Sequence, residues 1–123
     1  MGYVPPSMAS VPEWQRIVAS EFNNQPWRKR NVLATKTSAY TIVEGDDVVP
    51  CDATSAAFSV TLPAAAQFTG MSFTVIKIDA AANNVTLDGN GSETINGAAT
   101  YAITAQWESA TVISNGTGWF VIA

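Results

Sequence analysis

The residues of this chain that could carry out chemistry are acids, one cysteine and several aromatic side chains, because the sequence contains no histidine. Asp88-Gly89-Asn90-Gly91-Ser92 begins like a calcium loop, with oxygen-bearing side chains at its first, third and fifth positions. The pattern then fails, because Glu93 stands where an EF-hand needs glycine and Ala99 where it needs a bidentate glutamate. We therefore interpret these residues as a tight turn and expect no metal site.

Four further acids lie close together in the sequence: Glu44, Asp46, Asp47 and Asp52. Such a group could hold a cation or act as a pair of catalytic acids. Glycoside hydrolysis needs two carboxyl groups about 5 to 10 Å apart across a cleft, and sequence neighbours on one turn rarely supply that arrangement. A solvated turn explains the group better.

Cys51 is the single cysteine, so the chain cannot form an intrachain disulfide. No histidine is present to activate its thiol as a nucleophile, and a buried small apolar side chain is the better interpretation. The lack of histidine and of a second cysteine also excludes ordinary zinc sites. We expect no catalytic residue, no cofactor and no enzymatic activity.

The aromatic residues Tyr101, Trp107, Trp119 and Phe120 could stack on sugars if they were exposed. In a strand-rich domain of this size, large aromatic side chains more often fill the core. We therefore expect them to be buried.

Charge is divided unevenly along the chain. Residues 1–36 hold five of the six basic residues and carry a net charge of +3, whereas residues 37–123 hold eight acids and only Lys77, a net charge of −7. A soluble domain usually has more surface charge than that second part, unless other copies or a partner cover its surface. The division indicates a basic arm, residues 1–36, followed by a body, residues 37–123, that does not bind nucleic acid.

The arm is expected to contain one short α-helix. Ser10 and Glu13 have the spacing of a capping box, and apolar residues then recur at helical spacing until Pro26. A helix of about three turns is too short to be stable alone, so its apolar face must pack on the body, on sister chains or on a partner. The residues that we expect to bind a partner are Trp14, Ile17, Val18, Phe22, Trp27, Arg28, Lys29 and Arg30.

The last four of these residues, Trp27-Arg28-Lys29-Arg30, combine an aromatic with cations, as nucleic-acid sites do. On a chain of net charge −4 this signal is weak. A solvated linker, or docking on an acidic protein surface, explains the segment better than nucleic acid does.

From Thr37 the apolar period changes from helical spacing to two. Phe58, Val60 and Leu62 alternate with polar residues, and Asn96-Gly97 is a strong tight-turn signal. Pro50 makes the strand around it an edge or irregular strand. Eight or nine short strands at intervals of 8 to 14 residues predict an all-β fold, a compact antiparallel β-sandwich or barrel-like domain preceded by the helical arm.

The body carries an ordered series of small motifs. They are Val60-Thr61-Leu62-Pro63-Ala64-Ala65, Phe73-Thr74-Val75 through Lys77-Ile78-Asp79, Asn84-Val85-Thr86-Leu87-Asp88-Gly89, Gly91-Ser92-Glu93-Thr94-Ile95-Asn96-Gly97, Tyr101 and Gly118-Trp119-Phe120-Val121-Ile122. Over about 65 residues this series resembles the β-rich module of tail-fibre and other virion structural proteins of tailed bacteriophages. The resemblance implies a homotrimer without enzymatic activity.

Two functions are compatible with this resemblance. The first is a capsid decoration (cement) protein, a trimer that docks on the major capsid protein or another virion component and stabilises the shell. It is favoured because a fibre needs a long shaft or coiled coil and the sequence has neither. The alternative is a tail-fibre or receptor-binding tip component that binds host carbohydrate.

The expected location follows from the N-terminal sequence. It has neither the basic region nor the apolar region of a signal peptide, and no apolar run is long enough to span a membrane. We expect assembly in the host cytoplasm, a place in the virion, and no membrane partner.

Overall fold

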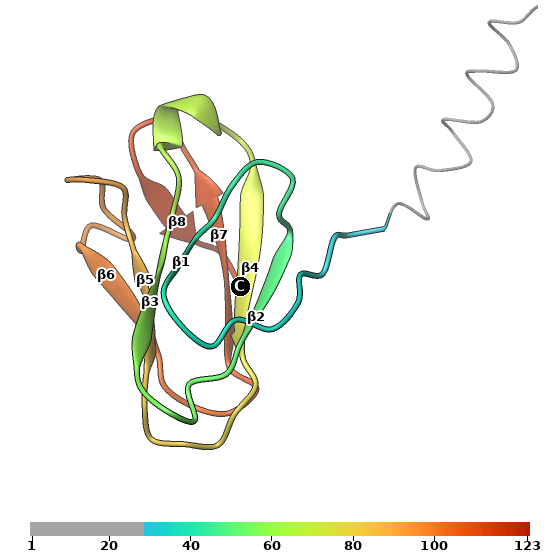
Figure 1. The fold of residues 1–123 in the computed structure, drawn as a ribbon. Coiled ribbons are helices and arrows are strands. Elements are labelled where there is room, and N and C mark those ends of the chain that lie inside the picture. The colour runs from blue at the N-terminus through green and yellow to red at the C-terminus, as the bar shows by residue number, and fades with distance from the viewer. Residues whose placement is uncertain (1–28) are drawn as a thin grey trace, which may run out of the picture.

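The computed structural model describes residues 29–123. They form eight strands and one short 3-10 helix (Figure 1). The elements are β1 (Tyr40–Thr41), β2 (Val48–Cys51), β3 (Phe58–Thr61), η1 (Ala65–Gln67), β4 (Ser72–Lys77), β5 (Val85–Asp88), β6 (Thr100–Ile103), β7 (Ser109–Ser114) and β8 (Trp119–Val121). The all-β class is confirmed. The predicted arm helix lies outside the described residues.

The strands form two four-stranded sheets, with the orders β1-β3-β5-β6 and β2-β4-β7-β8. Through its first five strands the chain alternates between the sheets, so that each of the first three strands pairs with the strand two places further along the sequence. Figure 1 shows β3, β5 and β6 on one side of the molecule, with β2 and β4 on the other. We call the two sheets the odd sheet and the even sheet after β1 and β2.

The prediction of an antiparallel sandwich is wrong for half of the pairings. The β1–β3, β2–β4 and β3–β5 pairs are parallel, and only β4–β7, β5–β6 and β7–β8 are antiparallel. The physical reason is the alternating path, because a chain that returns to a sheet after crossing the other one re-enters it in the same direction. Both sheets are therefore mixed.

The core lies between the sheets, where alternate residues of every long strand point inward. Phe73 and Val75 of β4 are 1% and 0% exposed, and Val60 of β3 faces them from the odd sheet with no exposed surface. The ring of Phe73 lies 5.8 Å from that of Phe68 and 5.8 Å from that of Trp119, in tilted arrangements. The alternation predicted for β3 and β4 thus produces the buried faces.

Residues 31–36, which the sequence interpretation assigned to the arm, are hydrogen bonded along β2. Leu33 N donates to Val48 O and Lys36 N donates to Pro50 O, each over 2.9 Å. β2 is the outermost strand of the even sheet, as the proline at its centre predicts, and this irregular segment covers its free edge. Within residues 29–123, no helix has the length and apolar character that crossing a bilayer requires.

Candidate functional site

Six of the eight residues expected to bind a partner, Trp14, Ile17, Val18, Phe22, Trp27 and Arg28, lie outside the described residues. Lys29 and Arg30 are described, and both are exposed. They directly precede residues 31–36, the segment that is hydrogen bonded along β2.

Arg30 is attached to the body rather than extended into solvent. Its Nη2 atom donates to Thr74 Oγ1 over 3.1 Å and to the backbone oxygen of Asp47 over 3.4 Å. The backbone N–H of Asn31 donates to Asp47 Oδ2 over 2.7 Å. These contacts hold Arg30 and Asn31 against Asp47, which precedes β2, and against Thr74 of β4.

A third cation of the N-terminal region also lies against the body. The Lys36 ammonium is 4.2 Å from the centre of the Tyr40 ring, a cation–π contact. Tyr40 Oη donates to Asp46 Oδ2 over 2.7 Å, and burial together with this bond raises the pKa of Tyr40 to about 12. Asp46 is therefore part of a packed polar contact and not a solvated turn residue.

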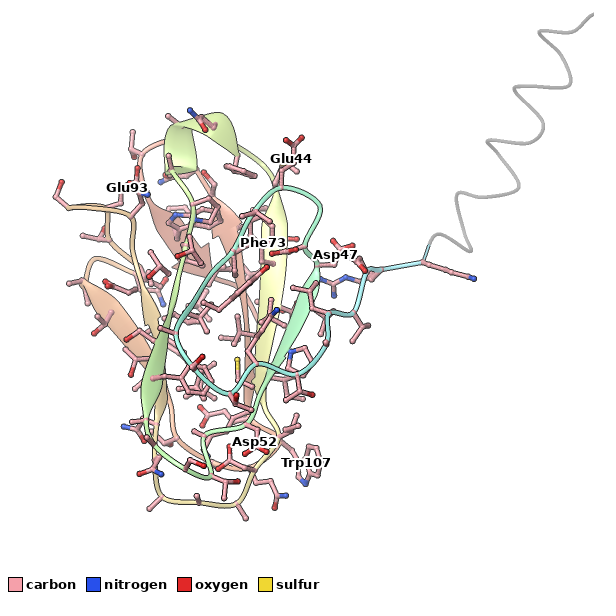
Figure 2. All side chains as sticks on the ribbon, in the orientation of Figure 1. Glu44, Asp47, Asp52, Phe73, Glu93 and Trp107 are labelled. Atoms are coloured by element: carbon pink, nitrogen blue, oxygen red, sulfur yellow. The ribbon has the colours of Figure 1, made fainter. Side chains whose placement is uncertain are left out.

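The acidic group does not form a site. Figure 2 places Glu44, Asp47 and Asp52 at three different heights on the molecule. Asp52 Oδ1 accepts from Thr54 N over 2.9 Å, and Asp46 Oδ2 accepts from Val43 N over 3.0 Å. No group of three or more possible metal ligands occurs within residues 29–123.

Lys77, the one basic residue of the body, is fully buried. Its Nζ atom lies 2.6 Å from Asp79 Oδ2 and donates to Ala81 O over 3.0 Å. Asp79 Oδ1 accepts from Ala53 N over 2.7 Å. The bond from Lys77 lowers the pKa of Asp79 to about 2. The surface formed by residues 37–123 is therefore without a cation.

Cys51 pairs with Lys77 in the register of β2 and β4, and it is buried. Burial raises the pKa of its thiol to about 12. The interpretation of Cys51 as a buried small side chain is confirmed.

The prediction that the four aromatic residues fill the core is wrong for two of them. Trp119 is 1% exposed and Tyr101 packs partly against the core, but Trp107 and Phe120 are 64% and 48% exposed. Phe120 points outward because strand alternation places its neighbour Trp119 inward. Trp107 lies before β7, where alternation gives no information.

Trp107 is held in a closed loop at one end of the molecule. Its φ is 68°, a left-handed conformation that is costly for a large side chain. Its backbone N–H donates to Lys77 O over 2.7 Å, and Glu108 Oε1 accepts from Thr104 N and Ala105 N over 2.9 and 3.0 Å. These bonds lower the pKa of Glu108 and fix the loop that exposes the indole.

The Trp107 loop lies at the end of β4, and the end of β2 lies on the other side of that strand. Ile78 N donates to Cys51 O over 2.9 Å, and Trp107 N donates to the backbone oxygen of Lys77, the last residue of β4. Asp52, the residue after Cys51, therefore shares this end with Trp107, as Figure 2 shows. An exposed indole can stack on a sugar ring, and a carboxylate at the same end of the molecule can accept hydrogen bonds from sugar hydroxyl groups.

Comparison of the chain with models of known protein families gives no match, and comparison with curated proteins gives none either.

Proposed function

We propose that this chain is a non-enzymatic structural protein of a tailed-bacteriophage virion, and that it decorates the capsid as a homotrimer. In this proposal the arm docks on the major capsid protein while the β-body caps a junction between capsomers. The resemblance of the body's motifs to phage structural modules gives the class of protein.

The observation that carries the proposal is the burial of Lys77. With this side chain paired to Asp79, the body presents only acidic and neutral side chains to solvent. Attraction to an acidic surface must then come from the basic residues before Thr37, among which Arg30 is hydrogen bonded to Asp47 and to Thr74 of β4.

The test is binding of the full-length protein to undecorated capsids, measured by co-sedimentation. A double variant, Arg28→Ser with Lys29→Ser, is expected to bind at least tenfold more weakly at about 0.1 M salt, because it removes two positive charges. At this salt concentration the Debye length is about 10 Å, so charges in contact still attract one another. Trp14→Ala with Phe22→Ala is expected to weaken binding further and leave the thermal unfolding of the body unchanged.

The matched control for charge is Gln67→Glu with Ala102→Glu, which makes the chain more acidic by the same amount at two exposed positions of the body. It is expected to bind almost as the unchanged protein does. Equal loss of binding in both double variants would show that net charge, and not the arm, governs docking. Failure of the unchanged protein to bind capsids would contradict the decoration proposal.

The exposure of Trp107 favours a second candidate function, a receptor-binding tip that recognises host carbohydrate. Trp107 would stack on a pyranose ring and Asp52 would accept hydrogen bonds from ring hydroxyls. Adsorption to host cells and binding to glycan arrays are expected to be lost in Trp107→Ala. The control is Val43→Ala, which removes an apolar side chain that is 53% exposed. Binding that persists in Trp107→Ala would contradict this candidate.

A further inference from the structure

The outer face of the even sheet carries no charged side chain. Strand register arranges its residues in three rows that run across the sheet. The rows are Ser72–Ile113–Phe120, Val48–Thr74–Thr111–Ile122 and Pro50–Ile76–Ser109. Six of these ten side chains are apolar, and Phe120 and Ile122 are 48% and 58% exposed. We call these ten residues the neutral face.

The polar groups at the centre of the neutral face already have partners. Thr74 Oγ1 and Thr111 Oγ1 are 2.9 Å apart and share a hydrogen bond, and Arg30 Nη2 also donates to Thr74 Oγ1. Covering these two threonines with an apolar surface would therefore cost little desolvation. Arg30, directly before the segment that lines β2, reaches onto the neutral face, and it also donates to the backbone oxygen of Asp47, the residue before β2.

The odd sheet has a different outer face. Its outward residues are Thr41, Ser59, Thr61, Thr86, Asp88, Thr100 and Ala102, which are mainly hydroxyl side chains with one acid. Asp88 pairs across the strands with Thr61 and Thr100, in the row at one end of this face. Two copies that met through this face would oppose like charges.

We propose that the neutral face is the surface through which copies of this chain associate with one another, an inference that rests on the proposed trimer. The body is strongly acidic, so identical copies repel one another wherever their acids approach. The neutral face allows contact between copies without opposed acids, and each copy supplies the apolar surface that the next one needs.

The test is the mass of the full-length protein in solution at micromolar concentration, measured by light scattering coupled to gel filtration. The unchanged protein is expected to show three times the chain mass of 13.0 kDa. Phe120→Lys should dissociate it to monomers, because the lysine would bring like charges together in a desolvated contact. Ile122→Lys is a second variant with the same expectation, and circular dichroism checks that each variant is folded.

Ala102→Lys is the matched control, since it adds the same charge at an exposed position on the outer face of the odd sheet. It should keep the mass of the unchanged protein. A trimer that survives both Phe120→Lys and Ile122→Lys would overturn the inference and leave the trimer standing. Dissociation by Ala102→Lys alone would move the interface to the odd sheet and overturn the inference as well.

A monomeric unchanged protein that still binds capsids would overturn the inference and the proposed homotrimer, while capsid decoration itself would stand. If that monomer loses thermal stability both in Phe120→Lys and in Trp14→Ala, the chain's own N-terminal segment covers the neutral face. If the unchanged protein is a trimer but does not bind capsids, that result would contradict the proposed function and leave the inference about the neutral face standing.

Discussion

Lys77 and Asp79 form an ion pair inside the β-body, with Lys77 Nζ 2.6 Å from Asp79 Oδ2 and the lysine side chain fully buried. Asp79 also accepts hydrogen bonds from the backbone of Ala53 and Ala81. The carboxylate therefore connects β4 to the segment after β2 and to the turn that leads toward β5. A buried charge is stable only when it is paired and hydrogen bonded in this way.

The first prediction concerns acid stability. Because the folded-state pKa of Asp79 is about 2, below its ordinary value of 3.8, the folded protein binds this proton less tightly than the unfolded chain. The stabilisation is present above pH ~4 and is lost as the pH falls from there through about 2. Urea denaturation at a series of pH values should show the free energy of unfolding falling across this window.

Asp79→Asn is the variant that checks this origin. Asparagine removes the negative charge beside Lys77, and its NH2 group would oppose either the Lys77 ammonium or the Ala53 N–H. The variant should therefore be less stable at neutral pH, and its stability should fall less steeply between pH 4 and 2. A slope as steep as that of the unchanged protein would mean that other carboxyl groups cause the acid sensitivity.

The second prediction compares two glycines. Gly97 has a φ of 83° and open space around its Cα, so Gly97→Ala should cost only the left-handed backbone strain, about 1 kcal/mol. A Cβ on Gly89 would collide with the backbone carbonyl of Glu93, which cannot rotate away as a side chain would. Gly89→Ala should lie at the upper end of the roughly 1–3 kcal/mol that overpacking costs. Chemical denaturation of both variants measures the difference, and equal losses would contradict the predicted clash.

The third prediction concerns strain at Trp107, whose φ is 68°. Glycine adopts this conformation freely and alanine does not, so Trp107→Gly should be more stable than Trp107→Ala by about 1 kcal/mol. Both variants lack the indole, which makes them a matched pair. Thermal unfolding measures the difference. Equal stability would mean that the loop relaxes to another conformation once the indole is removed.

The fourth prediction concerns Cys51. Its thiol is buried and its pKa is about 12, so very little thiolate is present and the sulfur is shielded. Alkylation by iodoacetamide at pH 8 should be at least about a hundredfold slower in the native protein than in urea. Mass spectrometry over time gives both rates. Rapid labelling of the native protein would show that β2 opens readily.

Local patterns predicted the strands well and their partners poorly. The alternation of Phe58, Val60 and Leu62 defines β3, and Asn96-Gly97 forms the expected tight turn, with Asn96 at a φ of 52°. A period of two records which side of a strand is buried, but it carries no information about which strand lies beside it. The parallel pairs were therefore missed.

The candidate site was harder to predict for a related reason. In β4 the alternation continues through Lys77, which points inward because Asp79 and backbone oxygens neutralise it. The sequence alone indicates a lysine between two isoleucines, and a lysine is rarely buried unless it is paired. The exposure of Trp107 depends on a loop closed by Glu108, four residues after Thr104, and such a capping carboxylate could have been recognised as a turn signal.

The alternating path of the chain also governs when the body can fold. β1 cannot meet β3 until β2 has crossed to the even sheet, and β4 finds its second neighbour only when β7 has been made. Neither sheet can therefore be completed as a local hairpin, and pairing over such sequence distances slows folding. We expect the nascent chain to stay unfolded on the ribosome until β7 and β8 have emerged, and then to fold in one slow cooperative step.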